Sequence, residues 1–87
     1  SIGIDKNGLE NMDRKILKNL IVNYDGGPTG GKSLAISINE DIQTIEDVYE
    51  PYLIKKGFIE RTSRGRVATD RAYRLFGMNK SRNKEQT

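Results

Sequence analysis

Residues 44–69, TIEDVYEPYLIKKGFIERTSRGRVAT, carry the strongest signals for secondary structure in this chain. From Ile45 to Leu53 apolar side chains recur at three- and four-residue spacing, which predicts a helix with one buried face. Two short strands, residues 58–61 and 66–68, are then expected on either side of the turn Thr62-Ser63-Arg64-Gly65. In this turn Gly65 is expected to supply the positive φ of a hairpin bulge. This order predicts a helix followed by a hairpin with a positively charged tip.

Local signals place the ends of that helix. Thr44 belongs to the residue types that cap helix N-termini, and Glu46 and Asp47 would follow in the first turn, where the helix dipole favours negative charge. Pro51 removes a backbone donor, so we expect a kink between Asp47 and Pro51. Gly57 is expected to end the helix.

Two further helices are predicted upstream. The first is expected to begin between Asn7 and Asn11, where Asn7 and Glu10 have the spacing of a capping box, and to end at residues 25–28. Its apolar stripe consists of Met12, Ile16, Leu17, Leu20, Ile21 and Tyr24. The second helix is short and buries Leu34, Ala35 and Ile38. Together with the helix that follows, it resembles a helix-turn-helix.

A last helix is predicted after the hairpin. Thr69 is expected to cap it and Gly77 to close it, while Ala72, Tyr73 and Phe76 pack against the first helix. The polar and basic residues 78–87 are expected to form a flexible tail. We therefore predict a mainly α fold with a small β-hairpin, a winged helix made of a helix-turn-helix plus a wing, over residues 1–77.

Composition limits the classes of protein that need to be considered. The chain has 87 residues, 34% of them hydrophobic and 31% charged, which fits one small domain with a thin core. It contains no Cys and no His, which excludes disulfides and makes zinc sites and histidine-based catalysis unexpected. No apolar run approaches the roughly 18 residues of a transmembrane helix, and no signal-peptide pattern is present. We expect a soluble, cytoplasmic domain without a membrane partner.

Charge is distributed unevenly along the chain. Residues 1–50 contain five Lys or Arg and nine Asp or Glu, a net charge of −4, whereas residues 51–87 contain ten and three, a net charge of +7. A surface with this excess of positive charge attracts polyanions. The C-terminal part of the chain is therefore the part expected to meet nucleic acid.

A phosphate-loop pattern occurs at Gly26 to Ser33, which reads GGPTGGKS. Such a loop binds nucleotide only between a buried strand and a helix, because the strand end holds the backbone amides around the phosphates. Here a helix precedes the pattern, and a chain this short has no parallel sheet. We therefore interpret it as a glycine-rich interhelical turn and expect no cofactor here. A small nucleotide hydrolase that depends on Lys32 remains a third hypothesis.

The hairpin contains the candidate nucleic-acid site. Arg61, Arg64 and Arg66 lie within six residues, and the fork of a guanidinium matches two phosphate oxygens. The alternative is that these are solvated turn residues, since basic turns are common. Lys55 and Lys56 are weaker candidates.

The helix before the hairpin is acidic where a helix-turn-helix protein reads DNA bases. Glu46, Asp47 and Glu50 would repel phosphates, so this helix is not expected to be inserted for sequence recognition. The same three carboxylates could form a metal site, but a dipole-stabilised first turn and a surface carboxylate explain them more simply. No metal is expected.

At these residues the sequence resembles the C-terminal winged-helix domain of RuvB, the bacterial motor ATPase that drives branch migration of Holliday junctions. The resemblance covers about Gly3 to Gly77 and is most specific where residues 44–53 are joined to the Arg-Thr-x-Arg-Gly-Arg hairpin. It also includes Gly8-Leu9, Met12-Asp13-Arg14, Gly26-Gly27-Pro28 with Gly30, and Gly57-Phe58. Ser63 departs from the family, which often has proline there, and Lys32-Ser33 is an unusual end to the glycine turn.

The resemblance implies a function for the domain. The parent would be an ATP-dependent DNA helicase that forms a hexamer, works with RuvA and carries ATP and Mg²⁺ in domains upstream of this chain. This chain would contain no catalytic residue and would be monomeric. Its wing would touch the sugar-phosphate backbone of double-stranded DNA, with Arg66 as the first contact and Arg64 as the second. Arg61, Thr62 and Gly65 would complete the site.

A second hypothesis assigns the domain to another class. Winged helices also serve as protein-docking modules. In that case the acidic first half of the chain would meet a basic partner, and DNA would not bind.

Overall fold

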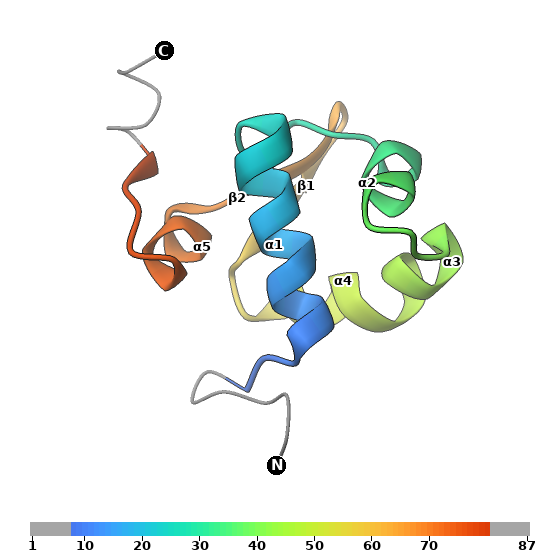
Figure 1. Ribbon diagram of the computed structural model, residues 1–87, viewed down its shortest axis with the longest axis horizontal. Helices are drawn as coiled ribbons and strands as arrows, with labels where there is room; N and C mark the ends of the chain where they lie inside the picture. The colour runs from blue at the N-terminus through green and yellow to red at the C-terminus, as the bar shows by residue number, and fades with distance from the viewer. Residues whose placement is uncertain (1–7, 81–87) are drawn as a thin grey trace.

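The structure, a computed structural model, describes residues 8–80 and is a winged helix, as the sequence predicts (Figure 1). Its helices and strands follow in the order α1 Asn11–Tyr24, α2 Gly31–Ser37, α3 Ile42–Thr44, the π-helix η1 Ile45–Tyr49, α4 Glu50–Lys55, β1 Ile59–Thr62, β2 Gly65–Ala68 and α5 Asp70–Leu75. In Figure 1, α1 crosses the middle of the molecule, with α2 and α3 on one side of it and α5 on the other.

Helix α1 forms the centre of the core. Ile16, Leu17 and Leu20 are fully buried along one face, at the spacing that the sequence predicts. The helix starts within the expected window, but its capping box joins Glu10 to Asp13, whose carboxylate accepts the Glu10 amide at 2.9 Å. The proposed box at Asn7 involves a residue outside the described range. Between residues 8 and 80 no helix is long and apolar enough to cross a membrane.

The predicted cap of the third helix is wrong by three residues. Asp41, not Thr44, is the N-cap, and its carboxylate accepts the backbone N–H of Thr44 at 3.0 Å. Both residue types cap helices, and the sequence did not show that Asp41 had this role. Glu46 and Asp47 therefore lie in the π-helical segment, after the turn that Asp41 caps.

The predicted disturbance at Pro51 takes the form of a π-helix. Pro51 has no backbone N–H and cannot complete the α-helical hydrogen bond to Asp47. In the π segment the N–H of Glu50 instead reaches the carbonyl of Ile45, five residues earlier. This widened turn precedes α4, and both Glu46 and Glu50 contact the hairpin.

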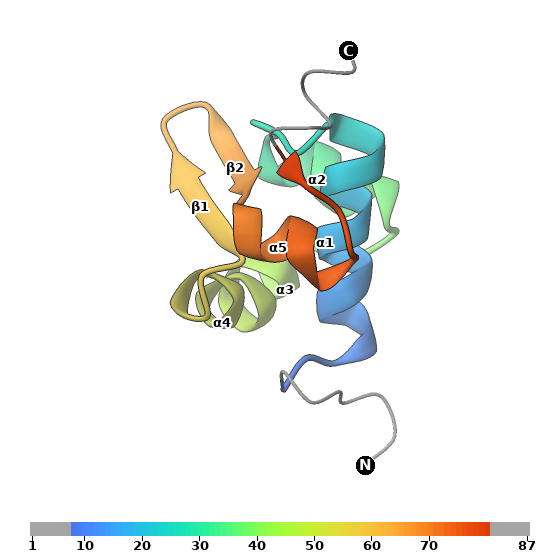
Figure 2. The ribbon, with the colours of Figure 1, turned by 90° about the vertical axis from the view of Figure 1, so that its left-hand side faces the viewer.

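The hairpin has a regular antiparallel register. Ile59 pairs with Ala68, Arg61 with Arg66, and Thr62 with Gly65, so only Ser63 and Arg64 form the turn and the expected bulge is absent. Because side chains alternate along a strand, the two arginines lie on the same face as the buried pair of Ile59 and Ala68. Figure 2 shows the turn projecting from the helical body.

The glycine-rich connection between α1 and α2 lies against strand β2. Thr29 forms a bridge with Arg66, with hydrogen bonds of 3.0 and 2.8 Å between their backbones. Gly27, with φ of +90°, passes so close that a Cβ there would overlap the carbonyl oxygen of Arg66. On the other side, a Cβ on Gly65 would lie 2.5 Å from the Thr29 oxygen, so close approach as well as positive φ requires glycine.

The C-terminal helix is capped as predicted, but the first residues of the expected tail pack on the body. Thr69 accepts the Ala72 amide with its hydroxyl, and Ala72 and Tyr73 are buried. Met78 packs against the core, and the Lys80 ammonium donates to the carbonyl of Ala68 at 2.7 Å. Residues 78–80 therefore dock on the body, while the rest of the predicted tail, 81–87, is outside the described residues.

Replacing Tyr73 with Phe is expected to leave the free energy of unfolding at neutral pH unchanged within about 1 kcal/mol, because the buried hydroxyl has no hydrogen-bond partner among residues 8–80. Burial, followed by the Asp25 carboxylate, raises the pKa of Tyr73 above its ordinary value of 10.0. The folded state thus keeps a proton that the unfolded state loses above about pH 10, and stability falls as the pH rises through the folded pKa.

Tyr73→Phe should reduce that alkaline loss, which urea denaturation at pH 7 and above pH 10 would measure. Tyr24→Phe is the control, since its hydroxyl has a partner in the carbonyl of Ser33 and no such burial. A loss of several kcal/mol at pH 7 would mean that the Tyr73 hydroxyl is bonded after all.

Candidate nucleic-acid interface

Arg64 occupies the exposed tip of the hairpin. The Thr62 hydroxyl accepts the Arg64 backbone N–H at 3.1 Å and donates to the Gly65 carbonyl at 3.0 Å, so Thr62 orders the two-residue turn. In the described part of the chain the Arg64 guanidinium has no ion-pair partner. The positive charge at the tip is therefore available to an external anion.

Arg66 is not placed where the sequence suggested. Its side chain is only 7% exposed, and its Nε donates to Glu50 Oε2 at 2.5 Å while Nη2 donates to Glu46 Oε2 at 2.7 Å. The hydrogen bond to Glu50 is the main cause that raises the pKa of Arg66, against the opposing effect of burial. A phosphate could reach this guanidinium only by displacing both carboxylates. This placement favours a structural role for Arg66 over the predicted role of first DNA contact.

The segment with the phosphate-loop pattern, Gly26 to Ser33, leaves space for the Arg66 side chain. A Cβ on Gly31, the first residue of α2, would lie 2.8 to 3.0 Å from the guanidinium atoms. Helix α1, not a strand, precedes the glycines, as the sequence interpretation required. Packing against β2 thus explains glycines that a motif search would assign to phosphate, and Lys32 is exposed on α2.

Arg61 is intermediate between exposed Arg64 and buried Arg66. It stands directly across the strands from Arg66, its side chain is 55% exposed, and its guanidinium nitrogens lie 3.7 Å from Glu46 and 3.9 Å from Glu50. These distances are too long for hydrogen bonds, so the pairing with the carboxylates is weak. Arg61 can turn toward an external anion without leaving a buried charge unpaired.

The acidic residues of η1 and α4 bind other side chains of the domain. Glu46 and Glu50 bind Arg66, and Asp47 accepts both hydrogen bonds, at 3.0 and 3.1 Å, from the amide of Gln43. In residues 8–80 no group of three Asp, Glu, His or Cys is arranged to hold a metal ion. The carboxylates of Glu46 and Glu50 therefore serve to anchor the hairpin.

The weaker candidates lie at the end of α4. Lys55 and Lys56 are exposed, and the Lys56 ammonium lies 5.8 Å from the centre of the Tyr52 ring. They add positive charge near the base of the hairpin. Neither belongs to the turn that carries Arg64.

Comparison with known proteins finds a family whose model matches most of the chain. Residues 6–77 match the family described as RuvB C-terminal winged helix domain. The Holliday junction branch migration complex subunit RuvB of Fusobacterium nucleatum subsp. nucleatum is 53% identical over 75 residues, which make up 86% of this chain and 23% of that protein. The subunit of the same name from Prosthecochloris aestuarii is 58% identical over 76 residues, 87% of this chain and 22% of that protein.

A solved structure supports the same assignment. The Thermotoga maritima RuvB Holliday junction branch migration motor matches with a TM-score of 0.86 and 46% identity, over 90% of this chain and 26% of that one. The chain thus spans between 22% and 26% of the length of these relatives. Since the family match covers nearly all the described residues, and the relatives are similar in both sequence and fold, this chain belongs to the RuvB C-terminal winged helix domain family.

Proposed function

We propose that this domain grips the sugar-phosphate backbone of duplex DNA with its hairpin, as the DNA-contacting module of a Holliday junction branch-migration motor. The observation that supports it best is the unpaired guanidinium of Arg64 at the tip of an ordered, projecting turn. Arg61 is the second contact, because it is half exposed and only weakly paired. Thr62 and Gly65 shape the turn, and Arg66 anchors it.

One helix, η1, could face a DNA groove. Its exposed side chains favour contact with the DNA backbone over recognition of bases. Along η1 the exposed side chains are Asp47 and Val48, and the amide of Gln43 is already bound to Asp47. Base recognition in the major groove relies mainly on Arg, Lys, Asn and Gln with free donors. Phosphate contacts alone position a protein without regard to sequence. A translocating motor needs contacts of that kind.

The hairpin is tied to the body at two places, which suits a part that transmits force. Arg66 joins β2 to η1 and α4 through Glu46 and Glu50, and its backbone joins β2 to Thr29. A load on the tip would therefore reach the helical core and not only bend the hairpin.

The proposal extends to the parent protein, of which this chain would be a part without catalytic residues. The parent would be an ATP-dependent DNA helicase in the bacterial cytoplasm, with ATP and Mg²⁺ bound outside this chain. Its partners would be junction DNA, RuvA and further copies of itself in a hexamer. The isolated domain would be a monomer that binds DNA weakly, with a dissociation constant on the order of 10⁻⁴ to 10⁻⁶ M.

Changing both Arg61 and Arg64 to Ala is expected to weaken binding to duplex DNA about tenfold and to reduce the slope of log affinity against log salt by about 1 to 2, one for each lost phosphate contact. Fluorescence anisotropy of a labelled duplex, measured at low and moderate salt, would give both quantities. Two duplexes of different sequence should bind equally.

The matched control is Lys15→Ala/Lys18→Ala, which removes the same charge from α1, on the far side of the body from the hairpin (Figure 2). Equal losses in the two double variants would show that overall charge, not the hairpin, controls binding. If no variant and no wild-type protein binds DNA at low salt, the protein-docking hypothesis replaces this one.

A further inference from the structure

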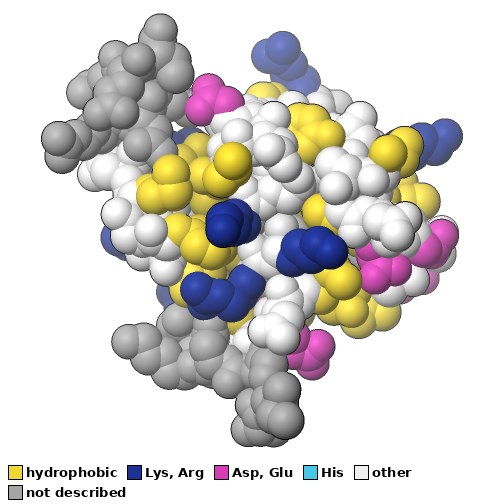
Figure 3. All heavy atoms as spheres, viewed as in Figure 1, with side chains coloured by type: hydrophobic (Ala, Val, Ile, Leu, Met, Phe, Trp, Pro, Cys, Tyr) yellow, Lys and Arg dark blue, Asp and Glu magenta, His cyan; other side chains and the backbone are white. Residues whose placement is uncertain are grey.

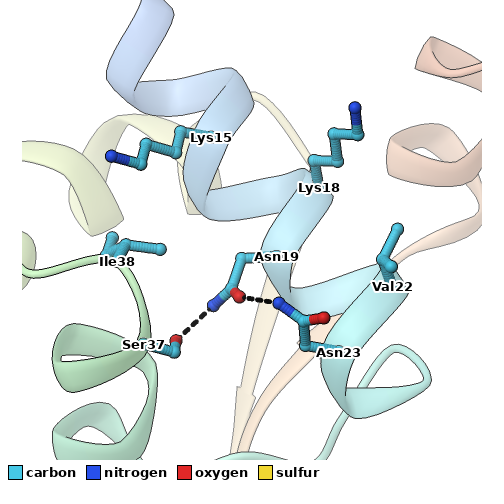
Figure 4. A pocket seen from close by; sticks show the side chains of 7 residues that line it. All are labelled: Lys15, Lys18, Asn19, Val22, Asn23, Ser37 and Ile38. Atoms are coloured by element: carbon cyan, nitrogen blue, oxygen red, sulfur yellow. Dashed lines mark hydrogen bonds between the residues drawn. The ribbon is translucent and has the colours of Figure 1, made fainter.

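A groove of about 300 Å³ lies between α1 and α2 and is not used by the hairpin site (Figure 4). Figure 3 shows this side of the molecule, the one on which α1 faces the viewer, with Lys and Arg side chains beside hydrophobic ones. Figure 2, which is turned by 90° from that view, shows the hairpin on the opposite side of the body from α1. The groove and the DNA-binding tip therefore face in different directions.

The groove has two positively charged side chains. Lys15 and Lys18 lie three residues apart on α1, both are exposed, and neither has an ion-pair partner among the described residues. Figure 4 shows their side chains extending in opposite directions along the groove. Two carboxylates of one bound molecule can therefore meet one ammonium group each.

The bottom of the groove carries an ordered chain of hydrogen bonds. The amide of Asn23 donates to the Asn19 oxygen, the Asn19 amide donates to the Ser37 hydroxyl at 2.5 Å, and Ser37 donates to the Leu34 carbonyl at 2.8 Å (Figure 4). The chain runs in one direction and leaves the oxygen of Asn23 without a partner in the described part of the chain. That oxygen can accept a backbone N–H.

The groove is also apolar. Val22 is 61% exposed, which is high for a valine on an otherwise well-packed helix, and Ile38 forms a buried part of the wall. An apolar side chain placed between them would remove this surface from water.

We propose that this groove docks an acidic protein segment in which an apolar side chain lies between carboxylates. The apolar side chain would cover Val22, the carboxylates would meet Lys15 and Lys18, and a backbone N–H would bind Asn23. DNA fits less well, because Val22 and Ile38 have no apolar group to pack against on a phosphate backbone, even though the two lysines could meet phosphates. The inference goes beyond the proposed function and does not depend on it.

The test uses the ¹⁵N-labelled chain and a blocked hexapeptide, Glu-Glu-Leu-Leu-Glu-Glu. The side-chain amide signals of Asn19 and Asn23 report directly on the groove and are expected to shift saturably on titration. Lys15→Glu/Lys18→Glu should weaken binding about tenfold or more. Val22→Gln, which keeps the charges, should weaken it several-fold.

One control matches the change of charge in the protein, and a second reverses the charge of the peptide. Lys55→Glu/Lys56→Glu makes the same change of charge at the end of α4 and should bind the peptide nearly as wild type does, and the peptide Lys-Lys-Leu-Leu-Lys-Lys should not bind. The proposal is overturned by any of three results: no shift of the two amides, equal effects of both lysine-pair variants, or no effect of Val22→Gln. Shifts of these amides by duplex DNA in place of the peptide would also overturn it.

Discussion

Glu50→Ala is expected to lower the free energy of unfolding by about 3 kcal/mol, because it leaves the buried guanidinium of Arg66 with only one carboxylate. Glu50 is only 2% exposed, so it does not contribute to the surface charge. The effect of its removal on stability must come from the ion pair with Arg66. Urea denaturation would measure the loss. Glu60→Ala is the control, since Glu60 is exposed on the outer face of β1 and should change stability by no more than about 0.5 kcal/mol.

A double-mutant cycle with Arg66→Ala makes this result specific. The two single changes remove the same interaction, so their costs should not add. Equal, small costs for Glu50→Ala and Glu60→Ala would contradict the structural role of the pair. If Arg66→Ala weakened DNA binding without affecting stability, Arg66 would be a DNA contact, as its place in the sequence suggested.

Gly27→Ala is expected to cost about 3 kcal/mol, since it combines an unfavourable positive φ with a clash against the backbone of β2. A methyl group at Gly27 overlaps the Arg66 carbonyl and would lie 3.2 Å from the Val67 Cα, so neither neighbour can move without shifting the strand. The bridge between Thr29 and Arg66 should weaken with it.

The same turn contains a matched control. Gly30 has φ of −67° and nothing within 4 Å of its Cβ position, so Gly30→Ala should change stability by no more than about 1 kcal/mol. Urea denaturation of both variants measures the difference. Similar small losses for the two would mean that the glycine turn is not held against β2 in solution.

The helices and the hairpin could be predicted because their signals are local. The apolar spacing of α1, the glycines that end helices and the Thr69 cap each act within a few residues. The choice between Asp41 and Thr44 as cap could not be made, since both fit the pattern and only the hydrogen bond decides. The proline signalled a disturbance but not that the helix would widen into a π turn.

The surroundings of the candidate site residues could be predicted in part. Arg64 follows from its place in the turn, but the burial of Arg66 depends on carboxylates 16 and 20 residues earlier in the chain. A signal was nevertheless present in the sequence. Arg66 lies two residues before Ala68, which puts it on the core-facing side of its strand, where a charged side chain needs a partner.

The glycines of the phosphate-loop pattern also depend on contacts with residues far along the chain. Gly27 and Gly31 are required because a strand backbone and a guanidinium pass close to them. Such long-range contacts are not visible in a short motif, which explains why the pattern alone would suggest nucleotide binding.

NMR titration of the ¹⁵N-labelled chain with an unlabelled duplex would locate the DNA contact on the domain. If the hairpin tip binds DNA, the largest backbone amide shifts will fall on Ser63, Arg64 and Gly65, while the amides of Asn19 and Asn23 stay unchanged. Shifts concentrated on α1 and α2, with the hairpin signals unmoved, would contradict the proposed DNA contact.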